Sequence, residues 1–340
     1  MSLKKEKKGN AFKLNKKQIV ISVFTLIMLI MGVVTALHHN PLADPHQELV
    51  KKIIACIIIA ATILIFVLLY DKISILPIEL YQNRRLIWKL AKNDFKKRYA
   101  GSYLGAVWAM VQPVVTVIMY YIVFDVIFDS TRQMASDGVE IPYVLFLTAG
   151  LVPWFYFSEA LTNGTNALIE YNYLVKKVVF KISILPIIKI IAATFIHVFF
   201  AGVLLLISCI YGYYPTVYTL QLIYYSFCMF IFVLALSYST CAIMVFFKDI
   251  GQIINILLQI GMWATPILWN INGISPTMQV IVKINPIVYI VNGYRSALCE
   301  QTWFFEDFYS TMYFWIFTVV IFGIGALIFK RLKVHFADVL

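Results

Sequence analysis

The sequence predicts an all-α protein that crosses a membrane several times, for two reasons. Its mean hydropathy is +0.84, and hydrophobic residues make up 61% of the chain, against 13% for charged residues. Its apolar runs also reach about 18 residues or more, the length at which a helix crosses the hydrocarbon core of a bilayer. Because an open sheet leaves backbone polar groups unpaired in lipid, we expect each of these runs to be helical.

Eight runs are long enough to cross. The first follows a lysine-rich tail, residues 1–18, that we expect in the cytoplasm. This run is too long for a signal peptide and lacks a cleavage site of the Ala-x-Ala type, so we expect it to remain as an anchor. With the second run it forms a transmembrane hairpin over residues 19–70. The expected spans are Ile19–Leu37, Ile53–Tyr70, Ala106–Phe128, Tyr143–Thr162, Ile187–Tyr211, Val217–Phe247, Ile253–Trp269 and Ser310–Phe329.

The lysines and arginines orient these spans. With the amino terminus in the cytoplasm, the outer segments hold only five of the chain's 28 lysines and arginines: Lys51, Lys52, Arg132, Lys283 and Arg295. Cytoplasmic segments of membrane proteins carry the excess of positive charge. We therefore expect a multi-pass protein with both termini in the cytoplasm.

The outer segment of residues 270–309 contains two short apolar stretches. They are Met278–Ile284 and Ile287–Val291, separated by Asn285 and Pro286. Both are too short to cross a bilayer. Because irregular backbone at membrane depth must be covered by protein or line a cavity, we expect two re-entrant or interfacial half-helices here.

A basic segment, residues 84–104, precedes the third span. Apolar residues recur there every three to four positions, and Lys89, Lys92, Lys96 and Lys97 lie on another side of the helical wheel. This pattern predicts an amphipathic helix in the plane of the cytoplasmic interface. Two roles stay open for its cations. They anchor the helix to anionic lipid, or they form a gate that receives a phosphate-bearing lipid.

Composition and spacing weigh against several other functions. The net charge of +11 favours an anionic membrane surface or substrate over nucleic acid. Cysteine and histidine show no metal-binding spacing, so we expect no metal site. Few ionisable residues lie inside the spans (Asp125, Glu159 and His197), which disfavours an ion-coupled flippase. A membrane glycosyltransferase or acyltransferase would need a partner motif for the carboxylates Glu306 and Asp307, and none is present.

The segment KNDFKKRYAGSYLGAVW, residues 92–108, resembles the interfacial helix of ABC type-2 polysaccharide-export permeases. These permeases are the membrane subunits of transporters for teichoic acid, lipopolysaccharide O-antigen and related cell-surface glycans. Further matches follow in chain order, and together they cover about residues 84–340. They are Gln112–Pro113, Gly150–Phe157, Asn172–Val178, Leu185–Pro186, Phe247–Ile250, Thr265–Ile267, Ile284–Pro286 and Gly293–Arg295.

The chain departs from the family pattern in two places. The hairpin of residues 19–70 is additional to the six spans of the family. Lys248 stands where the family usually has arginine, and an ammonium group cannot make the bidentate contact that a guanidinium makes.

The resemblance implies a six-span ABC type-2 exporter core over residues 105–340, with residues 84–104 as its gate helix. It also implies a permease subunit that moves polyprenyl-diphosphate-linked polysaccharide to the outer side of a bacterial plasma membrane. Teichoic acid, O-antigen and rhamnose-rich polysaccharide stay open as the glycan. An ion-coupled flippase of lipid-linked glycans and a membrane glycosyltransferase or acyltransferase are the alternatives.

The energy source is expected on another polypeptide. The chain lacks the glycine-rich phosphate-binding pattern of ATPases, so we do not expect it to be an enzyme. The resemblance implies that ATP and Mg²⁺ bind to a separate nucleotide-binding subunit. It further implies two copies of each chain, embedded in membrane lipids, with the glycan path between the two permeases.

Three groups of residues are candidates for the transport function. The substrate gate is expected at Lys96, Lys97, Arg98 and Tyr99. Contacts with the ATPase are expected at Tyr171, Asn172, Tyr173, Leu174, Lys176 and Lys177, and at Lys248 and Asp249. Aromatic residues of the third and fourth spans either line a sugar conduit or serve ordinary packing: Tyr120, Tyr121, Phe124, Trp154, Phe155 and Tyr156.

Overall fold

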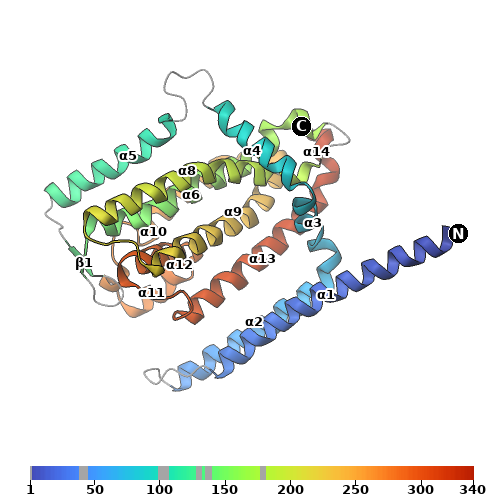
Figure 1. Ribbon diagram of the computed structural model, residues 1–340, viewed down its shortest axis with the longest axis horizontal. Coiled ribbons are helices and arrows are strands. Elements are labelled where there is room, and N and C mark those ends of the chain that lie inside the picture. Colours follow the sequence, from blue (N-terminus) through green and yellow to red (C-terminus); the bar gives the residue numbers. More distant parts are fainter. Residues whose placement is uncertain (1, 38–44, 99–106, 128–131, 135–139, 177–180) are drawn as a thin grey trace. The chain divides into compact units, whose positions relative to one another are not determined.

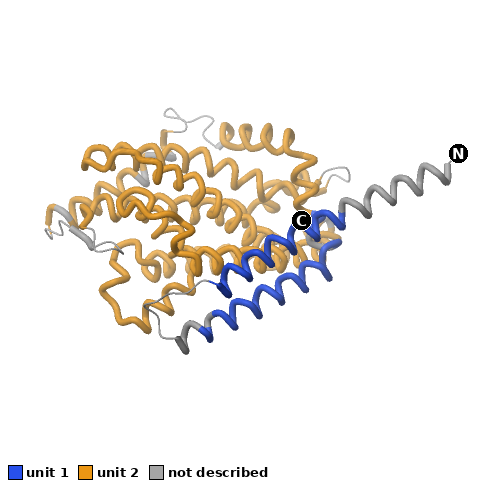
Figure 2. The backbone as a smooth tube through the Cα atoms, turned by 60° about the horizontal axis from the view of Figure 1, so that its bottom comes forward, with its two compact units in different colours: residues 1–75 blue, residues 76–340 orange. Residues whose placement is uncertain are grey.

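A computed structural model describes residues 2–37, 45–98, 107–127, 132–134, 140–176 and 181–340. These residues are almost entirely helical (Figure 1). The chain divides into two compact units, residues 1–75 and residues 76–340, which Figure 2 shows in different colours.

The first unit is a pair of long helices, α1 (Ser2–Leu37) and α2 (Pro45–Ile73). The two helices lie side by side and run antiparallel (Figure 2). The rings of Phe24 and Phe66 stack with centroids 3.8 Å apart, and the Lys17 ammonium lies 2.5 Å from a carboxylate oxygen of Asp71. Both helices are long and apolar enough to cross a membrane, as the sequence predicts.

The second unit begins with two helices, α3 (Ile75–Gln82) and α4 (Arg84–Arg98), the first starting at the boundary residue. Helix α5 (Trp108–Tyr120) continues as a π-helical segment, Tyr121–Ile127. Strands β1 (Arg132–Met134) and β2 (Glu140–Pro142) then pair antiparallel. The remaining helices are α6 (Tyr143–Glu170), α7 (Asn172–Val175), α8 (Leu185–Ile210), α9 (Gln221–Phe246), α10 (Ile250–Ala264), α11 (Pro276–Lys283), α12 (Pro286–Arg295), α13 (Phe308–Leu332) and α14 (Phe336–Val339).

Helix α6 is the central helix of this unit. Within its most apolar stretch 83% of the residues are buried, against 39% for α8 and 39% for α13. In Figure 1, α6, α8, α9 and α13 run alongside one another. A Cβ atom on Gly164 of α6 would lie 2.3 Å from Oγ of Ser237 on α9, so the absence of a side chain at this glycine lets the two helices approach closely.

The expected spans are largely confirmed. Six helical segments of the described residues are long and apolar enough to cross a membrane, and they coincide with six of the eight expected spans. The other two overlap the shorter apolar segments Val114–Phe124 and Ile250–Ala264. The expected end of the seventh span at Trp269 is wrong. Helix α10 ends at Ala264 because Pro266 follows Thr265 and holds it in an extended conformation.

The two half-helices expected after this span are present as α11 and α12. Each begins with a proline, Pro276 or Pro286, at a position where a missing backbone N–H costs nothing. The Asn285 side chain caps α12 by accepting a hydrogen bond from the Ile287 backbone N–H at 3.1 Å. Its amide nitrogen also donates to Thr265 Oγ1 at 3.0 Å, which ties α12 to the end of α10.

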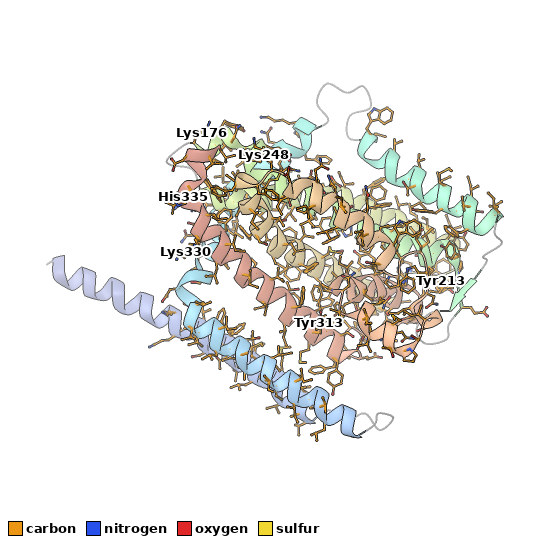
Figure 3. All side chains as sticks on the ribbon, turned by 180° about the vertical axis from the view of Figure 1, so that it is seen from behind. Lys176, Tyr213, Lys248, Tyr313, Lys330 and His335 are labelled. Carbon is orange, nitrogen blue, oxygen red and sulfur yellow. The ribbon has the colours of Figure 1, made fainter. Side chains whose placement is uncertain are left out.

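The two ends of this helix bundle differ in character. Figure 3 shows Lys176, Lys248, Lys330 and His335 gathered at one end, whereas Tyr213 and Tyr313 lie toward the opposite end. In the expected topology the first group belongs to cytoplasmic segments and the second group to the outer side. The four basic residues therefore mark the end expected to face the cytoplasm.

Candidate functional site

Helix α4 has the two faces that the sequence predicts. Ile87 and Ala91 are buried, at 3% and 0% exposure, while Leu90 and Phe95 are partly buried. Its lysines, on the other face, are exposed: Lys89, Lys92, Lys96 and Lys97. Arg98 is the last residue of the helix, and Tyr99 lies outside the described residues. The amphipathic prediction is confirmed for residues 84–98, and the gate assignment stays a prediction.

The apolar face of α4 packs on α8. The ring of Phe195 on α8 makes edge contacts with two rings of α4, Trp88 and Phe95, each with centroids 5.5 Å apart. These contacts position α4 along the outside of α8, and they leave its lysines on the far side. The helix therefore presents a row of cations while it stays attached to the core.

A cluster of charged residues beside this contact joins α4 to two other elements. The Lys189 ammonium, on α8, lies 2.8 Å from Oδ1 of Asp94 and 2.5 Å from Oε2 of Glu170. The Tyr171 hydroxyl donates a hydrogen bond to the same Asp94 oxygen, and the ammonium lies 4.8 Å from the centroid of the Tyr171 ring. The side chains of Lys189 and Asp94 are only 6% and 10% exposed. We call Asp94, Glu170, Tyr171 and Lys189 the ionic clamp.

The sequence does not single out two members of this clamp, Asp94 and Lys189. It assigns Tyr171, next to Glu170, to the ATPase contact, and charge counting places Lys189 among the cytoplasmic cations, although Lys189 lies inside the apolar run of the fifth span. A charged residue inside a span is costly and therefore a signal of function, which would have singled out Lys189. No comparable signal exists for Asp94, since it reads as one more polar residue of an amphipathic helix.

The candidate coupling segment, residues 171–176, forms the turn after α6 and the short helix α7. Tyr173 is 52% exposed, Asn172 and Lys176 are exposed, and Leu174 is partly buried against the core. Lys248 and Asp249 are exposed in the turn between α9 and α10, at the same end of the bundle as Lys176 (Figure 3). Lys177 lies outside the described residues.

The candidate conduit aromatics divide into three groups by burial. Trp154 and Tyr156 are buried within the chain, at 5% and 2% exposure. The Tyr156 ring stacks on His197 with centroids 4.4 Å apart, and its hydroxyl forms a 2.8 Å hydrogen bond with Thr194 Oγ1. Tyr121 is 37% exposed. The remaining three, all partly buried, are Tyr120, Phe124 and Phe155.

Arg295 is buried at the opposite end of α6 from the ionic clamp. Its guanidinium donates to the carbonyl oxygens of Phe146 at 3.2 Å, Pro266 at 2.7 Å and Ile267 at 3.0 Å. It also lies 3.5 Å from the centroid of the Phe146 ring. The side chain thereby connects α12, α6 and the segment after α10. In the sequence, Arg295 is an outer cation and the last residue of the Gly293–Arg295 family match, and neither feature indicates these contacts.

The described part of the chain contains no group of three or more His, Cys, Asp or Glu side chains placed to hold a metal ion.

Residues 85–299 match the model of one family, described as ABC-2 type transporter. The chain belongs to the ABC-2 type transporter family. The match covers all but the first residue of α4 and every later element up to α12, including the ionic clamp and Arg295.

Curated relatives of this ABC-2 transporter chain carry a more specific name. This chain is 28% identical over 262 residues to the O-antigen export system permease protein RfbA of Myxococcus xanthus. The aligned region covers 76% of this chain and 97% of that protein. It is 27% identical over 261 residues to the protein of the same name from Klebsiella pneumoniae, covering 75% of this chain and 95% of the relative. The family resemblance stated from the motifs is thereby confirmed.

Proposed function

We propose that this chain is the permease subunit of an ATP-driven exporter of polyprenyl-diphosphate-linked polysaccharide. The observation that carries the proposal is its similarity to O-antigen export permeases over nearly their whole length. The arrangement of exposed lysines on α4 supports it, because a row of cations at the membrane surface suits a lipid that carries a diphosphate.

Hydrolysis of ATP takes place on a separate nucleotide-binding subunit, in a complex of two ATPase and two permease copies in the bacterial plasma membrane. Exposed residues at the basic end of the bundle, Tyr173, Lys176, Lys248 and Asp249, are available for its contact. Tyr173 supplies the large apolar side chain that dominates the binding energy of many interfaces. Both termini of the chain lie on the same, cytoplasmic side.

The substrate enters beside α4, where Lys96, Lys97, Arg98 and Tyr99 form the gate, and the glycan moves between two copies of the chain. Tyr121 is the most exposed of the candidate conduit aromatics in the described residues. Trp154 and Tyr156 reach such a path only if the contacts of α6 with α10 and α8 rearrange, since both are packed there.

Depletion of the protein in its own bacterium tests the proposal. We expect an undecaprenyl-linked polymer to accumulate inside the cells while the same polymer disappears from the surface, and its composition identifies the glycan. The purified chain is expected to hydrolyse no ATP until its ATPase subunit is added. Normal surface polysaccharide after depletion, with no lipid-linked polymer retained inside, would exclude the proposed function.

A further inference from the structure

The ionic clamp holds together three segments that are far apart in the chain. Asp94 comes from α4, Glu170 and Tyr171 from the end of α6, and Lys189 from the first turns of α8. One ammonium group serves two carboxylates, and one oxygen of Asp94 accepts from both Lys189 and Tyr171. The other oxygen, Oδ2, is buried and has no hydrogen-bond partner in the described part of the chain.

Stability alone is a poor explanation for such a cluster. Removing charges from water costs several kcal/mol per ion, and buried ion pairs can often be replaced by apolar residues without loss of stability. The apolar contacts of Phe195 with Trp88 and Phe95 already attach α4 to α8. What the clamp adds is a fixed position of α4 relative to the end of α6, because ionic hydrogen bonds tolerate little displacement.

The clamp connects two regions that the proposed function uses separately. Asp94 precedes Lys96 and Lys97 by two and three residues on the same helix, so a shift of Asp94 carries these lysines with it. Tyr171 is the first residue of the coupling segment, and Glu170 immediately precedes it. Burial and the neighbouring Asp94 carboxylate raise the pKa of the Tyr171 hydroxyl, so it remains a hydrogen-bond donor.

We infer that Lys189 is a positioning residue that transmits movement of the coupling segment to the lysine-bearing helix α4. The inference rests on the proposed function and assigns a role to Asp94 and Lys189, neither of which is a candidate contact for the ATPase or the substrate. A displacement of residues 171–176 by the ATPase pulls on Asp94 through Lys189 and Tyr171, and α4 follows. Without the clamp, hydrolysis continues but α4 no longer responds.

The test compares hydrolysis with export in the complete transporter, permease together with its ATPase. Asp94→Asn and Lys189→Met each break the clamp. For both variants we expect export of the cell's own lipid-linked polysaccharide to fall at least tenfold. Stimulation of ATP hydrolysis by the lipid-linked polymer extracted from depleted cells is lost as well. Subunit assembly and basal hydrolysis stay within twofold of wild type, which a general structural defect would not allow.

A double variant separates loss of the clamp from misfolding caused by a single unpaired buried charge. Asp94→Leu with Lys189→Met replaces both buried charges by apolar side chains, and Glu170, whose side chain is 49% exposed, is free to pair with water. We expect this variant to assemble and hydrolyse ATP as wild type does, yet to export no better than either single variant, since the residues act as one unit. Lys330→Met, the loss of an exposed lysine at the same end of the bundle, is the matched control and should export normally.

Two outcomes overturn the inference. One is export by the double variant at the wild-type rate. The other is a parallel fall in assembly, basal hydrolysis and export, which reduces the clamp to a structural element. Failure of the proposed function looks different, because the wild-type transporter itself would then export no lipid-linked polysaccharide.

Discussion

Replacement of Arg295 by methionine is expected to destabilise the larger unit of the protein. The guanidinium donates to three backbone carbonyls, and two of these, on Pro266 and Ile267, follow the end of α10. Phe146, inside α6, retains its helical hydrogen bond in the variant, whereas the other two carbonyls lose a buried charged donor. Each such loss costs about 1–3 kcal/mol.

The stacking of the guanidinium on the Phe146 ring adds about 0.5–2 kcal/mol to the loss, while removal of a buried charge offsets part of it. We therefore expect a net destabilisation of about 2–4 kcal/mol for Arg295→Met. At about 2–4 °C per kcal/mol, the scaling for domains of 150–250 residues, the thermal midpoint falls by roughly 5–15 °C. The thermal midpoint of Arg295→Lys should lie between those of wild type and Arg295→Met, because an ammonium keeps the charge but cannot donate through a planar fork of N–H groups.

The assay is thermal unfolding of the detergent-purified chain, followed by the loss of its monodisperse peak in size-exclusion chromatography. Lys283→Met is the matched control, since Lys283 is an exposed cation on the neighbouring half-helix α11. We expect it to change stability by less than about 0.5 kcal/mol. An Arg295→Met midpoint within 1 °C of wild type, with the same peak, would refute the structural role assigned to this residue.

Four further predictions follow from the fold and the proposed function. Gly164→Ala should lower the free energy of unfolding by about 1–3 kcal/mol, because the added methyl group forces α6 and α9 apart. Gly202→Ala, with open space around it, should be neutral, and equal thermal midpoints for the two variants would contradict the close contact at Gly164. Cys56 is an exposed free cysteine, so labelling is done in a Cys56→Ser background. An impermeant thiol reagent outside intact cells should label Lys283→Cys but not Lys176→Cys, and the reverse pattern would show that the expected topology is inverted. Tyr173→Ala with Leu174→Ala should weaken ATPase binding at least tenfold in a pull-down titration, and unchanged binding removes both residues from the contact. Arg98→Lys should lower export if a guanidinium grips the substrate's diphosphate, and wild-type export assigns Arg98 to lipid anchoring instead.

Local patterns in the sequence predicted the elements well, because burial in a helix repeats every three to four residues. On α4 the prediction separated exposed Lys92 and Lys96 from buried Ala91 correctly. It located the half-helices from Pro286 and the short apolar stretches around it. The end of α10 was missed because the apolar run continues past Pro266, although the residue before a proline disfavours helix.

Pairings between distant residues were beyond this kind of reasoning. Asp94 and Lys189 are 95 positions apart, and nothing in either local pattern states that the two side chains meet. Arg295 reads as an outer cation, yet the fold directs it inward to the carbonyls that the broken backbone after α10 leaves without helical partners. Such partners are set by how helices pack, and charge counting along the chain cannot reveal them.

Helix α6 is fastened by a cation near each end, Arg295 at its first turn and Lys189 at its last. The attachment points at Phe146 and Glu170 are 24 residues and therefore about 36 Å apart along the helix, more than the roughly 30 Å of a bilayer core. Because α6 is attached near both ends, a lateral force bends the helix instead of shifting it along its axis. Pro153, which removes the hydrogen bond to the Ala149 carbonyl, is the natural place for that bend. The ring of the neighbouring Trp154 packs closely against Gly261 of α10, so bending of α6 would move α10 as well.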